Sequence, residues 1–232
     1  MVRKIFQERL QMALFLLTID LSDKLKSASS ITARASGWFD GDPTILPIPS
    51  DAAPEIPRLI LKNRDDSLLT TISPARIDLI SSKVTPWNER EKALSDYLRP
   101  LEGLVSSVKE DLRGAISRIG WVATHLIELE SSANRLFLDT WTKHPAFVDL
   151  YEGQLRWLNR GEYAGLEVNR VVQIVTSRMT DDPSRDNLLR ITIDINTVPE
   201  KPLDLDKSTT MSLAQQFSEA ATQLFEAVLP KV

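Results

Sequence analysis

Few side chains in this chain could carry catalysis or bind a metal. It has no cysteine and only two histidines, His125 and His144, nineteen residues apart. The lack of cysteine excludes disulfides, thiolate metal ligands and cysteine nucleophiles. A zinc site would need carboxylates converging on the histidines from elsewhere, and the spacing provides none. Eight glycines are scattered without a phosphate-binding pattern, and no GxSxG, HExxH or EF-hand spacing occurs. We therefore expect no metal and no cofactor.

His125 is the one candidate for acid-base chemistry. It alternates with Trp121 and Ile127 on one face of a predicted strand over Ser117–Glu130. We favour a buried core histidine over a catalytic one, and we assign no catalytic residue. An enzyme that uses His125 together with an acid such as Glu128 or Asp194 remains the least favoured of three functional alternatives.

Aromatic and arginine side chains are more suggestive, because these types dominate the hot spots of protein interfaces. They gather in 131–165, which is predicted to be an irregular crossover, and we expect the proline-rich loop 40–57 to add to the same surface. The predicted partner-binding residues are Trp141, Phe147, Tyr151, Arg156, Trp157 and Arg160. Two alternatives stay open. The rings could form a satellite core, or the segment could bind single-stranded nucleic acid through Arg156, Arg160, Arg170 and Arg178.

The elements that would position these residues are mostly short strands. Predicted strands cover Ala13–Asp20, Ile31–Phe39, Arg58–Lys62, Leu68–Ile72, Arg76–Ser81, Ser117–Glu130, Leu166–Arg178 and Leu188–Asn196. For residues 1–21 a helix is the alternative, and a helical turn over Ser22–Ala28 is expected. Apolar residues on both faces of Ser117–Glu130 indicate an interior strand covered on each side. Asp194, on the exposed face of the last strand, is expected to pair with Arg190 or Arg170.

Two long helices complete the pattern. One begins near Trp87, with apolar residues three and four apart and a kink or a new helix at Pro100. The other begins after the N-cap Ser208 and ends before Pro230. The predicted fold is α+β, an antiparallel β-sheet packed by two main helices. It has two similar strands-then-helix halves, 1–116 and 117–232, which we expect to form one compact unit.

Composition sets the broad class. The chain has 232 residues, 42% of them hydrophobic and 26% charged, with a formal net charge of −4. These values are typical of a globular protein and give no electrostatic drive toward nucleic acid or anionic membranes. The apolar run Met12–Leu17 is too short to span a bilayer, and we expect no membrane segment and a cytoplasmic location.

The order of parts resembles a sporadically distributed family of uncharacterised prokaryotic proteins of about this length. The resemblance rests on Arg118-Ile119-Gly120 in the central strand, the stretch LFLDTWTKHPAFVDLYEG, the strand core Ile191–Ile195, and Phe217 and Phe225 in the last helix. The family's central strand usually continues with a Gly-Leu-Arg-Tyr-Ile-Asn run, which Trp121–His125 replaces here. The resemblance implies no activity, and its patchy distribution would suit a mobile or defence-linked gene.

From these observations we expect a non-enzymatic protein-interaction or adaptor subunit. The resemblance would place it within a multi-component prokaryotic defence or mobile-element system. Its partner would be another protein or further copies of itself. A nucleic-acid-binding protein is the main alternative.

Overall fold

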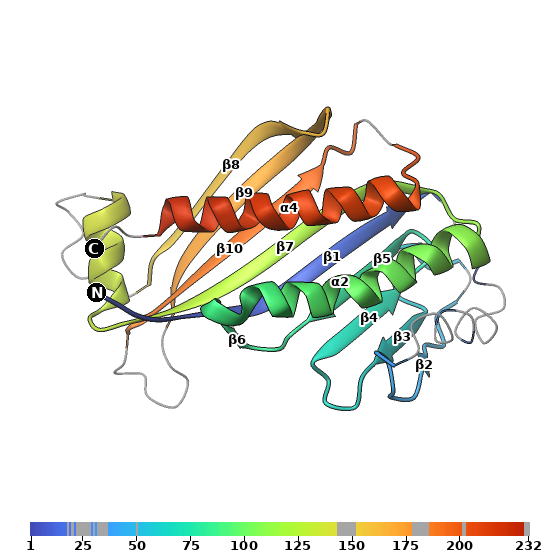
Figure 1. The fold of residues 1–232 in the computed structure, drawn as a ribbon, viewed down its shortest axis with the longest axis horizontal. Helices are drawn as coiled ribbons and strands as arrows, with labels where there is room; N and C mark the ends of the chain where they lie inside the picture. The colour runs from blue at the N-terminus through green and yellow to red at the C-terminus, as the bar shows by residue number, and fades with distance from the viewer. Residues whose placement is uncertain are drawn as a thin grey trace.

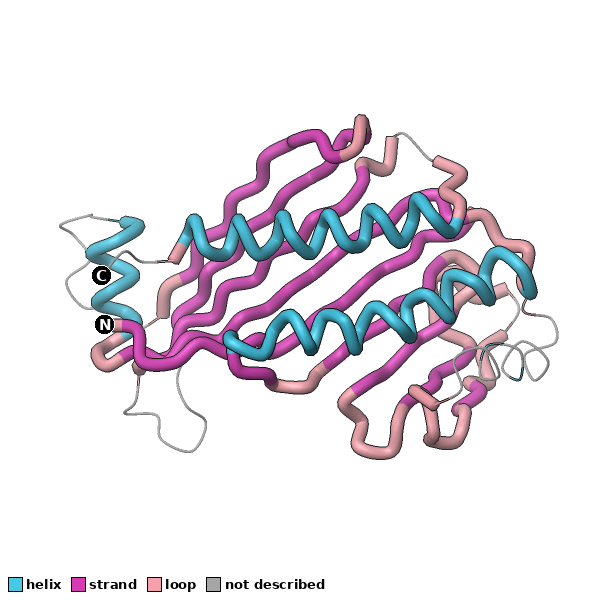
Figure 2. Tube along the Cα trace, in the orientation of Figure 1, coloured by secondary structure: helices cyan, strands magenta, loops and turns pink. Residues whose placement is uncertain are grey.

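The computed structural model describes residues 1–17, 19, 21, 29, 31, 37–49, 51–142, 152–177, 186–200 and 203–229. Within them, one ten-stranded antiparallel sheet carries two long helices on one of its faces (Figure 1; Figure 2). This confirms the predicted α+β fold with an antiparallel sheet. None of the helices in the described ranges is long and apolar enough to cross a membrane.

The strands are β1 Val2–Leu16, β2 Thr44–Ile45, β3 Leu59–Lys62, β4 Leu68–Ile72, β5 Arg76–Ser81, β6 Thr85–Pro86, β7 Ile116–Leu129, β8 Gln154–Tyr163, β9 Leu166–Ser177 and β10 Leu188–Thr197. The helices are α2 Arg90–Ser106, α3 Ala133–Phe137 and α4 Lys207–Val228. A 3-10 turn precedes α2, and π-helical turns follow α2 and α3.

The sheet is arranged around its two central strands. Its order is β2-β3-β4-β5-β1-β7-β10-β9-β8, and β6 pairs with β1. β1 and β7 are antiparallel, paired from Val2–Leu129 to Leu16–Ile116. Each central strand is followed by a meander whose last strand returns to pair with it, β5 with β1 and β10 with β7. A long helix then follows each meander, so the order of parts in the first half recurs in the second.

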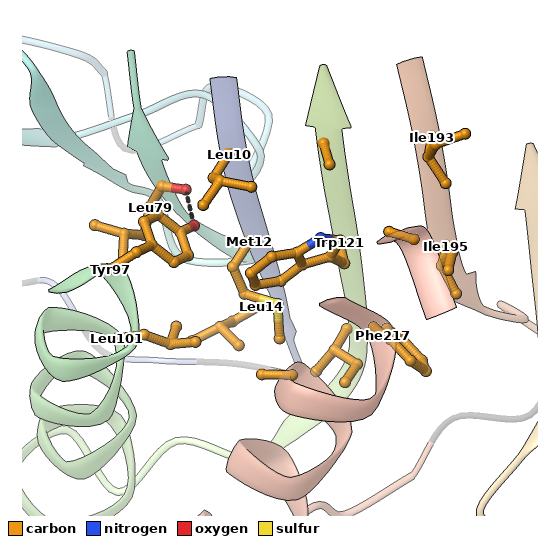
Figure 3. Packing of buried hydrophobic residues seen from close by; sticks show 14 of the residues in the cluster. Leu10, Met12, Leu14, Leu79, Tyr97, Leu101, Trp121, Ile193, Ile195 and Phe217 are labelled. Atoms are coloured by element: carbon orange, nitrogen blue, oxygen red, sulfur yellow. Dashed lines mark hydrogen bonds between the residues drawn. The ribbon is translucent and has the colours of Figure 1, made fainter. Parts of the chain in front are cut away.

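The core lies between the sheet and the two helices. Alternate residues of the central strands point toward the helices, because successive side chains of a strand point to opposite faces. They pack on the apolar stripes of α2 and α4 (Figure 3). The buried residues of this core include Leu10, Met12 and Leu14 of β1, Trp121 of β7, Ile193 and Ile195 of β10, Leu101 of α2 and Phe217 of α4. The Tyr97 hydroxyl donates a 2.7 Å hydrogen bond to the Leu79 carbonyl, and burial raises the pKa of Tyr97 well above its usual value.

The opposite face of the sheet has no described helix over it (Figure 2). β7 is an interior strand, as predicted, between β1 and β10. The described helices cover only one of its faces, and on the other face Val122 and Leu126 are half-buried. Polar and charged groups cover part of this face. Arg190 donates two hydrogen bonds to Glu8, at 2.8 and 3.0 Å, and the guanidinium groups of Arg76 and Arg118 lie over the Phe15 ring.

Asp194 also lies on this open face, but its expected ion pair is absent. Arg190 bonds to Glu8, Arg170 lies on the helix-facing side, and Asp194 accepts a 2.9 Å hydrogen bond from Asn196. The prediction of a salt bridge from Asp194 to either arginine is therefore wrong.

The N-terminal strand is longer and earlier than predicted. β1 begins at Val2 instead of Ala13, and the helical alternative for this segment is wrong. A bulge explains the error. Gln7 pairs with His125 and Arg9 with Thr124, so Glu8 is an extra residue that interrupts the period-two pattern. The predicted strand Ile31–Phe39 is also wrong at its described positions, since Ile31 is helical and residues 37–38 form a turn. The expected turn at 22–28 lies outside the described residues.

The first meander agrees with prediction. β4 and β5 have the predicted bounds, and β3 starts one residue late. The proline-rich segment before it is a loop that lies along β3, with Gly41 and Leu46 donating main-chain hydrogen bonds to Lys62 and Arg58. The buried Arg58 guanidinium in turn donates to the loop carbonyls of Ile56 and Ala52, which fixes the loop over this edge.

Three boundaries differ in the second half and the helices. Pro100 lies inside α2, so no new helix starts there. The N-cap of α4 is Asp206 instead of Ser208, and its carboxylate accepts a hydrogen bond from the Thr209 N–H. The crossover 131–165, predicted to be irregular, contains the ten-residue strand β8.

Candidate functional site

Strand β8 forms one edge of the sheet. It pairs with β9 along its whole length, and no strand among the described residues pairs with its other side. A two-residue turn joins β8 to β9. Its residues Ala164 and Gly165 both have positive φ, 51° and 75°, as the turn typical of tight β-hairpins requires.

The main chain of β8 alternates between β9 and the outside. The Thr176 N–H donates to the Gly153 carbonyl at 2.9 Å, so odd-numbered residues direct their main-chain groups toward β9. In an antiparallel pair the intervening residues direct theirs the other way. The N–H and C=O groups of Arg156, Leu158, Arg160 and Glu162 therefore point away from the sheet. One of them, the Arg160 carbonyl, accepts a 3.3 Å hydrogen bond from the Arg170 guanidinium.

The side chains of β8 are unusually exposed for a strand. Trp157 is 42% exposed on the helix-facing side, and Leu158 is 54% exposed on the open side. Arg156 and Arg160 are also exposed and lie on the open side with Leu158. Three of the predicted partner-binding residues, Arg156, Trp157 and Arg160, are thus brought together on one edge strand.

The other predicted residues do not join them in a single surface. Trp141 lies in the turn after α3, half-buried, and packs on Phe137 with ring centroids 5.6 Å apart. Phe147 and Tyr151 lie outside the described residues. Sequence reasoning missed Leu158 and the outward main-chain groups, which no residue type signals.

The arginines proposed for nucleic-acid binding are also divided. Arg170 lies on the helix-facing side, opposite to Arg156 and Arg160, where it donates a 2.9 Å hydrogen bond to Asn159. Its guanidinium covers Gly161 so closely that a Cβ there would lie 2.7 Å from the guanidinium carbon. Arg178 lies outside the described residues. The described arginines therefore do not form one basic groove.

His125 is part of the core between the helices. It is 2% exposed, stacks on Phe225 with centroids 4.0 Å apart, and meets Trp87 edge-on at 5.2 Å. Burial lowers the pKa of His125 from 6.5 to about 3, so the imidazole is neutral near pH 7. Its two proposed acidic partners, Glu128 and Asp194, lie on the opposite face of the sheet.

A pocket of about 260 Å³ lies above β7 between α2 and α4. Ala123 has a small side chain and lies between the larger Trp121 and His125 on the same face of β7. This leaves room for the pocket. Its other lining residues include Leu94 and Glu91 of α2, and Ala221, Thr222 and Glu219 of α4. No described residue hydrogen-bonds to the Trp121 Nε1 or to either nitrogen of His125. The pocket is mostly apolar with a few buried polar atoms, a combination typical of small-molecule sites.

No protein-family model matches the sequence, and no curated protein or solved structure is similar to it. The resemblance drawn from the order of parts stays a prediction.

We predict that His125 makes folding sensitive to mild acid. The unfolded chain takes up a proton near pH 6.5, whereas the folded protein resists it until about pH 3. The free energy of unfolding should therefore fall as the pH drops below 6.5, by at most about 1.4 kcal/mol per pH unit. Urea unfolding of a His125→Leu variant should lack this slope between pH 6.5 and 5, where carboxylates have barely begun to titrate.

Both proteins should carry His144→Gln, so that His125 is the only histidine in the reference protein and the His125→Leu variant has none. Parallel profiles for the two proteins over this pH range would contradict the account of a buried neutral His125.

Proposed function

We propose that this protein is a non-enzymatic interaction subunit that binds another polypeptide by strand addition to β8. The observation that carries the proposal is the row of outward main-chain N–H and C=O groups along a ten-residue edge strand. Such an edge can accept an extended segment as a further strand, with main-chain hydrogen bonds supplying affinity and side chains supplying specificity.

The two edges of the sheet differ in how far other parts of the chain cover them, and this difference favours a binding role for β8. The β3 edge is short, and β2 and the proline-rich loop lie along it. Natural proteins usually protect an edge in this way, or with proline, a bulge or charged side chains. β8 has charged residues but no proline, and its pairing with β9 runs without a bulge. The covering found at one edge is thus lacking along the described part of the other.

The exposed side chains of β8 suit a protein partner. Trp157 offers a large apolar surface on one side of the strand, and Arg156 and Leu158 flank it on the other. Tryptophan and arginine are the types that lose most binding energy when truncated at interfaces. A partner strand would meet side chains of this kind above and below its own main chain.

Affinity purification from the native host, followed by mass spectrometry, tests the proposal. We expect Leu158→Pro to lose the captured partners, because proline removes an outward N–H that no described residue uses, and an edge strand tolerates it. Trp157→Ala should weaken capture at least ~10-fold through the lost side-chain contact alone.

Val84→Ala is the matched control, since Val84 is 56% exposed on a loop and resembles Leu158 in exposure. Circular dichroism checks that each variant is folded. If folded Leu158→Pro and Trp157→Ala proteins retained every partner and the oligomeric state of the unmodified chain, the proposed function would be wrong.

The pocket above β7 supports a second candidate function, the binding of a small neutral molecule. The observation in its favour is the Trp121 N–H donor, which no described residue accepts, beside the neutral His125 in a mostly apolar space. A buried polar group without a hydrogen bond costs about 1–3 kcal/mol. A compact apolar ligand with one hydroxyl or carbonyl oxygen would satisfy these groups, and the uncharged imidazole gives no preference for an anion.

Titration with p-cresol, followed by the indole N–H resonance of Trp121, tests this second function. We expect a saturable shift with a dissociation constant on the order of 1 mM or tighter. Ala123→Leu should abolish the shift, because the longer side chain fills the space between Trp121 and His125. No shift of the Trp121 resonance in the unmodified protein would remove this candidate.

A further inference from the structure

We propose that the polypeptide added to β8 is the β8 strand of a second copy of this chain, paired antiparallel about a two-fold axis at Asn159. The inference rests on the proposed function and specifies its partner. It is drawn from the self-complementarity of the strand QLRWLNRGEY when it is turned against itself.

The main chain restricts the possible registers. Only even-numbered residues of β8 direct their N–H and C=O groups outward, so each must face an even-numbered residue of the other copy. Side chains of paired residues then lie on the same face of the joined sheet. With Asn159 on the axis, Arg156 faces the partner's Glu162, and Leu158 faces the partner's Arg160. The four outward residues from Arg156 to Glu162 in each copy would form about eight hydrogen bonds.

The side chains favour this register on the open face. The two-fold axis places Arg156 opposite the partner's Glu162 twice, once at each end of the paired strands. Both side chains are exposed, and neither forms an ion pair with a described residue. Opposite charges across an antiparallel pair are stabilising, and like charges in the same position are destabilising.

The helix-facing side is complementary in the same register. Trp157 faces the partner's Gly161, and the partner's Arg170 guanidinium lies directly over that glycine. The indole would therefore contact this guanidinium, and an aromatic ring against a cation is a favourable arrangement. Leu155 faces the partner's Tyr163, which gives an apolar pair at each end.

Neighbouring registers are worse. Moving the axis to Leu158 places Arg156 opposite the partner's Arg160, and moving it to Arg160 places two copies of that arginine opposite each other. Like charges would meet in both. The Asn159 register avoids these contacts and also pairs Trp157 with glycine.

An antiparallel pairing of the same kind already links the two halves of the chain. β1 and β7 pair antiparallel at the centre, and the long helices that follow their meanders lie on the same face (Figure 1). A two-fold axis perpendicular to the sheet at Asn159 would repeat this arrangement between molecules. The helices of both copies would then share one face of a continuous sheet.

Charge reversal tests the inference. In sedimentation equilibrium, Arg156→Glu and Glu162→Arg should each raise the dimer dissociation constant at least ~10-fold, because like charges then meet at both ends of the paired strands. The double variant Arg156→Glu/Glu162→Arg should restore dimerisation to within a few-fold of the unmodified chain. A double variant as monomeric as the single ones would overturn this register.

A single cysteine tests the axis itself, because the natural chain has none. Asn159→Cys should form a disulfide-linked dimer under mild oxidation, since directly opposed residues of this pair type have Cα atoms about 4.5 Å apart. Gln154→Cys is the matched control. It is exposed on the same strand, and its two copies would lie at opposite ends of the interface, so it should not cross-link.

The results separate this inference from the proposed function. Suppose that Asn159→Cys fails to cross-link and charge reversal leaves the dissociation constant unchanged, while Leu158→Pro still abolishes capture of another protein. In that case the partner strand is not a second copy of this chain, but the proposal of strand addition to β8 stands. If Leu158→Pro changes neither oligomeric state nor capture, both are wrong.

Discussion

The long antiparallel pairing of β1 with β7 holds the two halves of the chain in one sheet. It runs from Val2–Leu129 to Leu16–Ile116, and each meander attaches to its outer side. Because both strands direct alternate side chains to the same face, Met12, Leu14 and Trp121 form one floor on which α2 and α4 both pack. This central pairing also leaves main-chain groups without a strand partner at the two ends of the sheet. A sheet built outward from its centre must end in two edges, whose main-chain groups need water or another strand.

The two edges meet this requirement in different ways. On the first, β2 and the loop held by Arg58 supply main-chain partners for β3. On the second, β8 ends the described sheet with outward groups and an exposed Trp157. The proposed function therefore uses β8. Elsewhere on the open face Arg190 pairs with Glu8, and two arginines lie over the Phe15 ring.

Sequence reasoning succeeded where one physical signal controlled the structure. Strict alternation predicted β5 and most of β10, and an apolar helical stripe predicted α4. It failed at β1, where the extra residue Glu8 interrupts the alternation, and at β8, where exposure on both faces of an edge strand removes the alternation altogether. The candidate site was predicted in part, since residue type alone indicated Arg156, Trp157 and Arg160. Their arrangement on an open strand edge depends on pairing with β9, which no local pattern encodes.

Amide hydrogen exchange of β8, measured by NMR at several protein concentrations, tests the central claim most directly. The inward N–H groups of Leu155, Trp157 and Asn159 should be protected at every concentration, because they bond to β9. Those of Arg156, Leu158 and Arg160 should exchange freely in dilute solution and become protected as the concentration rises and a second strand is added. Free exchange of these outward amides at every concentration, in a folded protein, would contradict pairing of β8 with a second copy.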